Sequence, residues 1–532
     1  MKNRFKKIAV ILASTLISSS LFVGCNSNKT DVKSTTSIAG ESLLNVDVYL
    51  DYNWWSMATP FDESNKISKY IMDTQHIKLN FRNPSGDERE KLNIMIATNS
   101  LPDVIVMDRN DMYKKMISLK DIIPIDSYID KYKGFKSMVD AQAINMSKVD
   151  GKTYSFLNWS NNKKWGGFGR PPVINEKIYK ELGSPKLDTL DDLTSYLGKV
   201  KNANMKVNGK NVVPLQFSQN SAYPGALSVY FGDTNPIDYQ LKNPNYISSA
   251  KLMNEYFTKQ YINQDAFLEK KEQIDQKLST GRVAVLACGD DLVSVQKANS
   301  ALKASGSDVT YTTIPAFGNG DRSGKDVIYG RYTTLGWDSV CITKAAKEPE
   351  RIAKFFDWMA SAEGQRVVLF GPKGDLWDKT DKDGYPILKV GKSLHQTTEE
   401  NKLLPLYNFE LVGNSAWYDN AKLRINRALP KDKRDYIVSQ QDDLKLNRYL
   451  RDGTEFLNVA PDVSGAPETL IANDVNEYLK NEEPKLVTAS SQGELMKQLD
   501  KMDKDVMSKG YQKVLDYENK VWESNKKILG IK

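Results

Sequence analysis

The sequence predicts an α/β protein whose parallel-rich sheets are covered by helices and divided between two lobes. Three observations lead to this fold class. Short β-rich runs alternate with helical patterns near the N-terminus, and the same alternation returns later in the chain. After the N-terminal segment, about 490 residues remain, which is enough to build two large hydrophobic cores.

The first alternation starts with a β-rich run at residues 46–50 (VDVYL), a helical pattern over 62–74 and a second β-rich run at 77–81 (IKLNF). A helical pattern over 87–98 then leads to a buried strand at 104–107. Strands separated by helices form parallel sheets, because each helix carries the chain back to the start of the next strand. We therefore expect these five segments to form one helix-covered sheet.

Later segments repeat this alternation. Helices are expected at 189–201, 248–260, 349–368 and 490–526, and strands at 283–288 and 339–343. These segments provide a second set of strands and helices, from which the second lobe can form.

The first 24 residues are expected to be an export signal. Positive charges at residues 2–7 precede an apolar run over 8–23 that is too short and too serine-rich to span a membrane comfortably. Residues 26–41 contain almost no large apolar side chain, so they have nothing with which to build a core. We expect a disordered tether between the signal and the folded protein.

The end of the signal, FVGC at residues 22–25, resembles the lipobox of bacterial lipoproteins, in which small residues precede a cysteine that receives diacylglycerol. Phe22 departs from the Leu that is usual there, although Leu21 stands next to it. The resemblance implies that Cys25 carries acyl chains such as palmitate and anchors the protein to the extracellular face of the cell membrane without spanning it. An ordinary secretory signal with an incidental Cys25 is the alternative.

Charge and cysteine usage exclude several classes of protein. The 74 Lys and Arg and the 67 Asp and Glu residues are interleaved, and loss of residues 1–24 would remove four of the positive charges behind the formal +7. No nucleic-acid partner is therefore expected. Cys288 and Cys341 each lie in a strand-like apolar run, so we expect buried thiols rather than a disulfide or a reactive site.

Four longer motifs carry a family resemblance. They are LPDVIVMD, KIYKELGSPKLDTLDDLTSYL, STGRVAVLACGD and the segment 347–386, which starts KEPERIAKFFDWM. In this order and spacing, they resemble family 1 extracellular solute-binding proteins, and in particular the long lipoproteins of Gram-positive bacteria that supply oligosaccharides to ABC importers. The resemblance covers about residues 45–526. It implies a periplasmic-binding-protein-like fold that closes on an oligosaccharide, a monomeric state and the permease transmembrane subunits as partners.

The resemblance also predicts a domain organisation. Chain crossings between the lobes are expected near 165–173, 331–339 and 403–412. The expected parts are a signal at 1–24, a tether at 25–42, a first lobe at 43–165 plus 338–405, and a second lobe at 166–337 plus 406–532.

No metal or cofactor site is expected. His76 and His395 are the only histidines, which argues against a histidine-based metal site or catalytic triad. GNGDRSGKD at 318–326 lacks P-loop spacing, and TDKDG at 380–384 lacks the flanking ligands of a calcium loop, so both are expected to be turns. In many relatives a calcium loop stands where this chain has NANMKVNGKN at 202–211, which contains no carboxylate.

Enzymatic activity is not expected either. A glycoside hydrolase needs two carboxyl groups at a defined separation, for which Asp191-Asp192 and Asp290-Asp291 are the simplest candidates. Adjacent acids more often belong to the capped start of a helix.

The candidate ligand site is expected where aromatic and polar residues share loops. A sugar presents C–H faces that pack on flat rings and hydroxyl groups that need directional partners. Loops at the carboxyl ends of parallel strands line the ligand crevice. The predicted ligand-binding residues are Asp51, Trp54, Trp55, Asp108, Arg109, Trp159, Trp165, Arg170, Tyr223, Asp290, Arg331, Tyr332, Trp337 and Trp417. Trp358 and Trp522 lie in helical segments and are expected to be packing residues.

Together, the signal, the family resemblance and the loop aromatics predict a lipid-anchored protein that captures an oligosaccharide for an ABC importer. A peptide ligand and a surface glycoside-active enzyme remain the alternatives.

Overall fold

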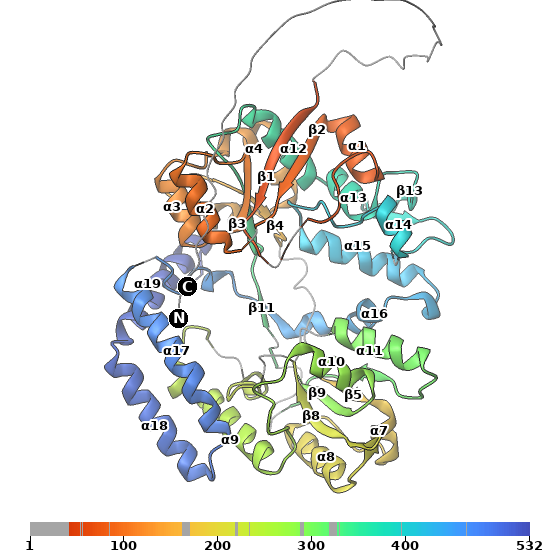
Figure 1. The fold of residues 1–532 in the computed structure, drawn as a ribbon, viewed down its shortest axis with the longest axis vertical. Helices are drawn as coiled ribbons and strands as arrows, with labels where there is room; N and C mark the ends of the chain where they lie inside the picture. Colours follow the sequence, from red (N-terminus) through yellow and green to blue (C-terminus); the bar gives the residue numbers. More distant parts are fainter. Residues whose placement is uncertain are drawn as a thin grey trace, which may run out of the picture. The chain divides into compact units, whose positions relative to one another are not determined.

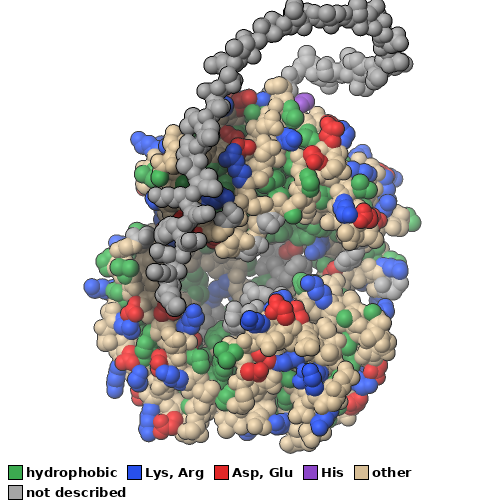
Figure 2. Space-filling model, in the orientation of Figure 1, with side chains coloured by type: hydrophobic (Ala, Val, Ile, Leu, Met, Phe, Trp, Pro, Cys, Tyr) green, Lys and Arg blue, Asp and Glu red, His purple; other side chains and the backbone are tan. Residues whose placement is uncertain are grey.

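The computed structural model describes residues 42–531, except for 54, 56, 85, 162–170, 219–221, 233–234, 288–291, 319–326, 329, 395 and 464 (Figure 1). Among the helices it describes, none has the length and apolar character needed to cross a membrane. Lys and Arg side chains alternate with Asp and Glu over the face seen in Figure 2, as the interleaved sequence predicts.

The first sheet has the strand order β2-β1-β3-β12-β4. Its strands are β1 (Leu44–Leu50), β2 (Ile77–Arg82), β3 (Val104–Asp108), β4 (Phe156–Asn158) and β12 (Asp338–Ile342). β1 pairs in parallel with β2 and β3, whereas β12 runs antiparallel to β3 and β4. The predicted parallel sheet is therefore confirmed, with one antiparallel strand inserted from a later part of the chain.

Helices on the first sheet include α1 (Lys66–Gln75), α2 (Glu88–Ala97), α3 (Asp111–Ser118), α4 (Asp126–Tyr132), α5 (Gly134–Met138) and α6 (Ala141–Met146). The helices predicted at 62–74 and 87–98 are confirmed as α1 and α2, whereas α3 to α6 were not predicted. The single helix predicted at 349–368 is two helices, α12 (Pro349–Ala360) and α13 (Ala362–Phe370). Ser361 separates them because its backbone is extended and its hydroxyl accepts a hydrogen bond from Gly364 N at 3.2 Å.

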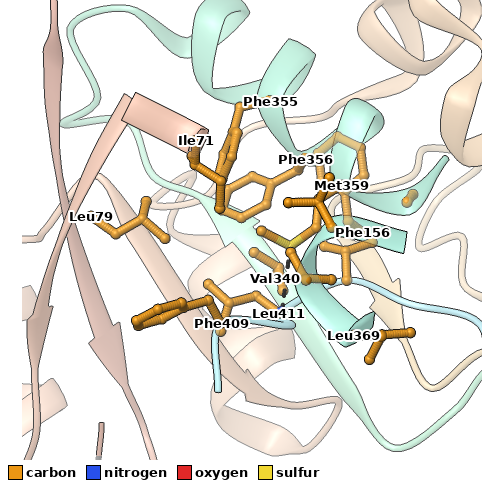
Figure 3. Close-up of a cluster of buried hydrophobic side chains, with 14 of the residues drawn as sticks. Ile71, Leu79, Phe156, Val340, Phe355, Phe356, Met359, Leu369, Phe409 and Leu411 are labelled. Carbon is orange, nitrogen blue, oxygen red and sulfur yellow. Dashed lines mark hydrogen bonds between the residues drawn. The ribbon is translucent and has the colours of Figure 1, made fainter. Parts of the chain in front are cut away.

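The core of this first lobe lies between the sheet and α12 (Figure 3). Phe156 of β4 and Val340 of β12 face Phe356 and Met359 of α12, and all four side chains are fully buried. Leu411 closes the cluster, and its backbone N–H donates to Met359 Sδ at 3.4 Å. The sheet and the helix therefore share one continuous hydrophobic interior.

One part of the predicted lobe division is wrong. Residues after 405 were assigned to the second lobe, but α15 (Ser415–Ala428) and the segment before it belong to the first core. The buried side chains that place them there are Phe409, Leu411, Val412, Trp417, Ala421 and Ile425. The apolar face of α15 is buried against the first lobe, which a boundary drawn from motif order does not reveal.

The second sheet has the strand order β10-β5-β9-β8, formed by β10 (Tyr311–Thr313), β5 (Val173–Asn175), β9 (Val283–Ala287) and β8 (Val213–Phe217). β8 and β9 are parallel, but β5 is antiparallel to both of its neighbours. This sheet is therefore mixed rather than parallel-rich.

Helices complete the second lobe. Those beside the sheet are α7 (Glu176–Glu181), α8 (Leu190–Asn202), α9 (Pro244–Thr258), α10 (Lys271–Ser279) and α11 (Leu292–Ala304). The C-terminal helices are α17 (Pro467–Val487), α18 (Gln492–Ser508) and α19 (Gln512–Leu529). Tyr246 and Ala250 of α9 share a buried cluster with Val475 of α17 and Leu499 of α18, which fixes this part of the C-terminal helices to the second lobe.

Hydrogen bonds join the chain crossings between the two lobes. β11 (Gly330–Tyr332) pairs in parallel with β15 (Leu450–Asp452), and Thr334 N donates to Thr454 Oγ1 at 2.9 Å. The third crossing was predicted at 403–412, but it lies between α15 and α16 (Tyr436–Asp443), since Thr313 N of the second sheet donates to Gln440 of α16 at 3.1 Å.

Candidate ligand-binding site

The site is built at one edge of the first sheet, where β1, β3 and β4 end and β12 begins. In the strand register, Asp338 stands opposite both Asp108 and Asn158. Asp51 follows β1 and donates its backbone N–H to Val106 O at 2.9 Å. Polar side chains from four strands are therefore gathered at a single edge, as expected for carboxyl ends that line a ligand crevice.

An aromatic cluster lies on this edge. The ring centroids of Tyr52, Trp55 and Trp337 are 5.8 Å apart for Tyr52–Trp55, 5.3 Å for Tyr52–Trp337 and 5.7 Å for Trp55–Trp337. Both tryptophans are partly buried, whereas Tyr52 is buried and donates its hydroxyl to Asp108 Oδ1 at 3.0 Å. We refer to Tyr52, Trp55 and Trp337 as the aromatic trio. It joins the loop after β1 to the second crossing and places aromatic rings beside a carboxylate.

Arg109 lies next to the trio, but its guanidinium group donates hydrogen bonds to protein oxygens. Nη1 donates to Asp338 O at 2.8 Å and to Ser339 Oγ at 3.3 Å, and Nη2 donates to Gly336 O at 2.7 Å. Burial lowers the pKa of Arg109, and the charge of Asp338 opposes this shift. The predicted ligand contact is therefore a positioning residue that fixes the backbone on both sides of Trp337.

Gly336 makes this arrangement possible. Its φ of +71° lies in the left-handed region, and a Cβ at this position would sit 1.8 Å from Asn158 O. Glycine is the residue that tolerates both conditions, so the second crossing can pass directly over the end of β4.

Two buried carboxyl groups lie beneath the site. Neither oxygen of Asp338 makes a well-formed hydrogen bond within the described part of the chain, and the same holds for Glu410 Oε1. Burial raises the pKa of Asp338 to about 8, although Arg109 and the Asn158 amide lower it in part. Burial, together with the charge of Asp338, raises the pKa of Glu410 to about 8. Both carboxyl groups therefore stay protonated at pH values well above those at which Asp and Glu usually ionise.

Sequence reasoning missed Tyr52, Asp338 and Glu410. Tyr52 and Asp338 directly adjoin residues that were selected, in DYNWWS and GWDS, so the same loop signal could have found them. No pattern around Glu410 marks it, because its burial depends on Gly413 and on the packing of α13.

The remaining predicted ligand-binding residues lie in several different parts of the chain. Trp159 stands at the end of β4, with its ring 5.2 Å from that of Tyr418, and Tyr223 is an exposed side chain of the second lobe. Tyr332 is partly buried in β11, and the guanidinium of its neighbour Arg331 lies 5.1 Å from the Phe456 ring centroid. Trp54, Trp165, Arg170, Asp290 and the proposed lipidation site Cys25 lie outside the described residues.

The expectation for Trp417 is wrong. It lies in the first turn of α15, is 8 % exposed and stacks on Tyr385 with ring centroids 5.3 Å apart. Its ring also meets Phe370 edge-on. Trp417 therefore anchors α15 in the first core and does not line the crevice. By contrast, Trp358 stacks on Phe355 and Trp522 on Phe456, which confirms both as packing residues.

Of the motifs that were interpreted as turns and caps, those at 191–192 and 380–384 behave as expected, whereas residues 319–326 of the other predicted turn, the pair Asp290-Asp291 and Cys288 lie outside the described residues. Asp192 forms a capping box with Thr189 at the start of α8. Asp381 accepts hydrogen bonds from the backbone of Asp383 and Tyr385, which closes the turn between β13 (Trp377–Thr380) and β14 (Pro386–Leu388). Cys341 is a buried thiol of β12.

Residues 202–211 also form a turn. They contain the hairpin of β6 (Lys206–Val207) and β7 (Lys210–Asn211), whose central residues Asn208 and Gly209 both have positive φ. Across the described ranges, no group of three or more His, Cys, Asp or Glu side chains is arranged to hold a metal ion.

Comparison with known proteins identifies the fold. The alginate-binding protein AlgQ2 is 17 % identical, with a TM-score of 0.62 over 91 % of this chain and 99 % of that one. FusA of S. pneumoniae in complex with kestose is 18 % identical, with a TM-score of 0.60 over 91 % and 99 %. An HMO-binding protein of Bifidobacterium longum infantis is 15 % identical, with a TM-score of 0.65 over 92 % and 99 %. These likenesses confirm the predicted periplasmic-binding-protein-like fold.

Curated proteins gave no match to this sequence. The model of the bacterial extracellular solute-binding proteins, however, matches residues 62–366, which is more than half of the chain. The matched range includes β2, β3, β4 and β12 of the first sheet, Trp337 of the aromatic trio and the four strands of the second sheet, whereas β1, Tyr52 and Trp55 precede it. The chain therefore belongs to the family of bacterial extracellular solute-binding proteins.

Proposed function

We propose that this protein is a lipoprotein, anchored through Cys25 to the extracellular face of the cell membrane, that captures an oligosaccharide and delivers it to the permease of an ABC importer. The observation that carries the proposal is the aromatic trio beside Asp108 at the edge of the first sheet. A sugar site needs aromatic rings for the C–H faces of the sugar and polar groups such as carboxylates for its hydroxyls, and this edge supplies both.

The chemistry of the edge favours a sugar over a peptide. The two partly buried indoles, Trp55 and Trp337, offer faces on which pyranose C–H groups can pack. Asp108 accepts the Tyr52 hydroxyl and keeps further lone pairs with which to accept ligand hydroxyls. Arg109, the nearby cation that would suit a peptide carboxylate, already donates to three protein oxygens. The similar structures of FusA with kestose and of the HMO-binding protein support the same ligand class.

Capture would act through closure of the two lobes. Asn161 N donates to Thr334 O at 3.0 Å and Thr334 N donates to Thr454 Oγ1, so the crossings act as one connected hinge. A ligand that contacts both lobes stabilises the closed form relative to the open one, which is a population shift. The permease would then recognise the closed, loaded form.

The test is calorimetric titration of the purified mature chain with a panel of oligosaccharides, followed by chromatography of the ligand. Trp55→Ala and Trp337→Ala should each weaken binding by about ten- to a hundredfold, because loss of a buried aromatic contact costs roughly 1–3 kcal/mol. Trp522→Ala is the matched control, since its ring packs on Phe456 and not in the trio. It should lower stability and leave affinity nearly unchanged.

Other outcomes separate the alternatives. Wild-type affinity in both folded trio variants would show that other residues line the crevice. Binding of peptides in place of sugars would show that the ligand is a peptide. Steady shortening of the oligosaccharide would show that the protein is an enzyme.

A further inference from the structure

The wall on which the aromatic trio stands is acidic. Asp51 and Asp108 follow β1 and β3, and both stand at the sheet edge that holds the trio. Asp87 and Glu88, at the start of α2, lie close enough for their charges to act on Asp51. Asp51 and Asp108 therefore stand at the candidate site, and the carboxylates at the start of α2 add to the negative charge around Asp51.

Among the described residues at this edge, the two arginines Arg89 and Arg109 do not offset that charge toward a ligand. Arg89, which faces Asp51, pairs with Asp111, with 3.3 Å between Nη1 and Oδ2. Arg109 donates to Gly336 O, Asp338 O and Ser339 Oγ. Both guanidinium groups are therefore engaged within the first lobe, and a ligand anion would have to displace one of these contacts to be neutralised.

We propose that Asp51 and Asp108 make the site selective for uncharged oligosaccharides and exclude chains that carry sugar carboxylates. This inference rests on the proposed function and adds the charge class of the ligand to it. A sugar hydroxyl can donate a hydrogen bond to either aspartate, whereas a sugar carboxylate has no proton to donate and brings a like charge into a partly desolvated place. Such repulsion is a standard source of specificity against a close analogue.

The electrostatics of Asp51 support this interpretation. Burial, together with the charges of Glu88, Asp108 and Asp87, raises the pKa of Asp51 to about 6, although Arg89 lowers it in part. Asp51 is half-buried, and its Oδ1 atom is buried without a hydrogen-bond partner in the described structure. The charges of Glu88, Asp108 and Asp87, which add to the effect of burial on Asp51, would also act on a ligand carboxylate. Exclusion should weaken as the pH falls through about 6, where Asp51 becomes neutral.

The experiment uses the neutral oligosaccharide that binds best in the panel and the same compound with its primary hydroxyls oxidised to carboxylates. Both are titrated at pH 7.5 and low salt into the wild type, Asp51→Asn, Asp108→Asn and the control Asp130→Asn. Asp130 is an exposed carboxylate of α4 that pairs with Lys136, so it belongs to the same lobe but not to this edge. The amide variants keep the side-chain shape and remove the charge.

The oxidised compound should bind wild type at least about thirtyfold more weakly than its neutral parent, since like-charge contacts of this kind oppose binding strongly. Asp108→Asn and Asp51→Asn should each reduce that ratio by about threefold or more, and the ratio should also shrink in about 1 M salt. Asp130→Asn should retain the wild-type ratio.

Equal affinity for the two compounds, or binding of an acidic oligosaccharide alone, would overturn the charge selectivity. An unchanged ratio in both folded edge variants would equally overturn the role of Asp51 and Asp108. If no sugar of either kind bound, the proposed function itself would fail, which is a separate result.

Discussion

Arg109 Nη2 lies 2.7 Å from the carbonyl oxygen of Gly336 and thereby ties the end of β3 to the crossing that carries Trp337. The same guanidinium reaches Asp338 O, so the two peptide carbonyls on either side of Trp337 are both fixed. The position of an aromatic ring in the candidate site thus depends on a cation that need not touch the ligand.

Replacing Arg109 tests whether its contacts with the crossing position Trp337. Arg109→Lys keeps the charge, but one ammonium group cannot reproduce the planar set of donors. We expect oligosaccharide affinity to fall about tenfold and the free energy of unfolding to fall by about 1–3 kcal/mol, because buried carbonyl groups lose their donors. Titration calorimetry and urea denaturation measure the two effects. Arg427→Lys, at an exposed pair with Asp442, should change neither, and unaltered affinity in Arg109→Lys would contradict the positioning role.

Gly336→Ala tests the close approach of the second crossing to β4. The new Cβ would lie 1.8 Å from Asn158 O, so the crossing must move and carry Trp337 with it. Both thermal stability and ligand affinity should fall. Gly209→Ala is the matched control, because Gly209 also has positive φ but no atom lies near its Cβ position. It should cost only about 1 kcal/mol of stability, and affinity should be retained. Equal effects of the two substitutions would mean that backbone strain alone is responsible.

The two buried carboxyl groups predict a pH dependence of stability. Asp338 and Glu410 have pKa values raised to about 8 in the folded protein. Between about pH 4 and pH 8 the folded state therefore binds more protons than the unfolded state, so their contribution to the free energy of unfolding falls as the pH rises. Asp338→Asn and Glu410→Gln should gain stability relative to wild type between pH 5 and pH 8 in urea denaturation. The exposed control Asp73→Asn should run parallel to wild type, and parallel profiles for all three variants would contradict the assignment.

Removal of metal ions is expected to have no effect. Residues 202–211 form a carboxylate-free hairpin at the position where many relatives have a calcium loop. Excess EDTA should therefore leave both the melting temperature and the oligosaccharide affinity unchanged, as measured by scanning fluorimetry and calorimetry. A large fall in melting temperature that added calcium restores would reveal an ion site built from other residues.

Cys25→Ser tests the membrane anchor. Without a thiol to receive diacylglycerol, the protein should appear in the culture medium, whereas the wild type should fractionate with membranes on immunoblots. Brief proteolysis should also release the body by cleavage within residues 26–41, which have nothing to bury. Membrane association that persists in the serine variant would contradict lipidation at this position.

The sequence was most informative where the signal is local. The periodicity of residues 44–108 predicts the strand and helix order of the first sheet, because burial on one face of a strand or helix leaves a repeat in the nearby sequence. The loops after the first and third predicted strands located Trp55 and Asp108, and the second predicted crossing located Trp337; the structure brings all three to one edge. The rule that carboxyl ends of strands gather at one place was sufficient for Trp55 and Asp108, whereas Trp337 precedes a strand and was found through the crossing that the family resemblance implies.

Local signals were insufficient where a side chain's partner lies far away in the chain. Trp417 and Trp337 both follow short polar segments, yet Trp417 packs on Tyr385 and Phe370, while Trp337 joins Tyr52 and Trp55. Arg331 stacks on Phe456, a residue of the C-terminal third of the chain. The sequence identifies such residues as aromatic or charged, but it does not say which element they will meet.

The sequence by itself determined the α/β class, the order of the elements and most of the strand ends from which the candidate site is built, because hydrophobic periodicity and turn chemistry act over a few residues. The tertiary structure alone decided that α15 belongs to the first core, that Arg109 faces the crossing and that Asp338 and Glu410 are buried together. These features follow from desolvation and contact between segments distant in the chain, and such energies exist only once the segments are brought together.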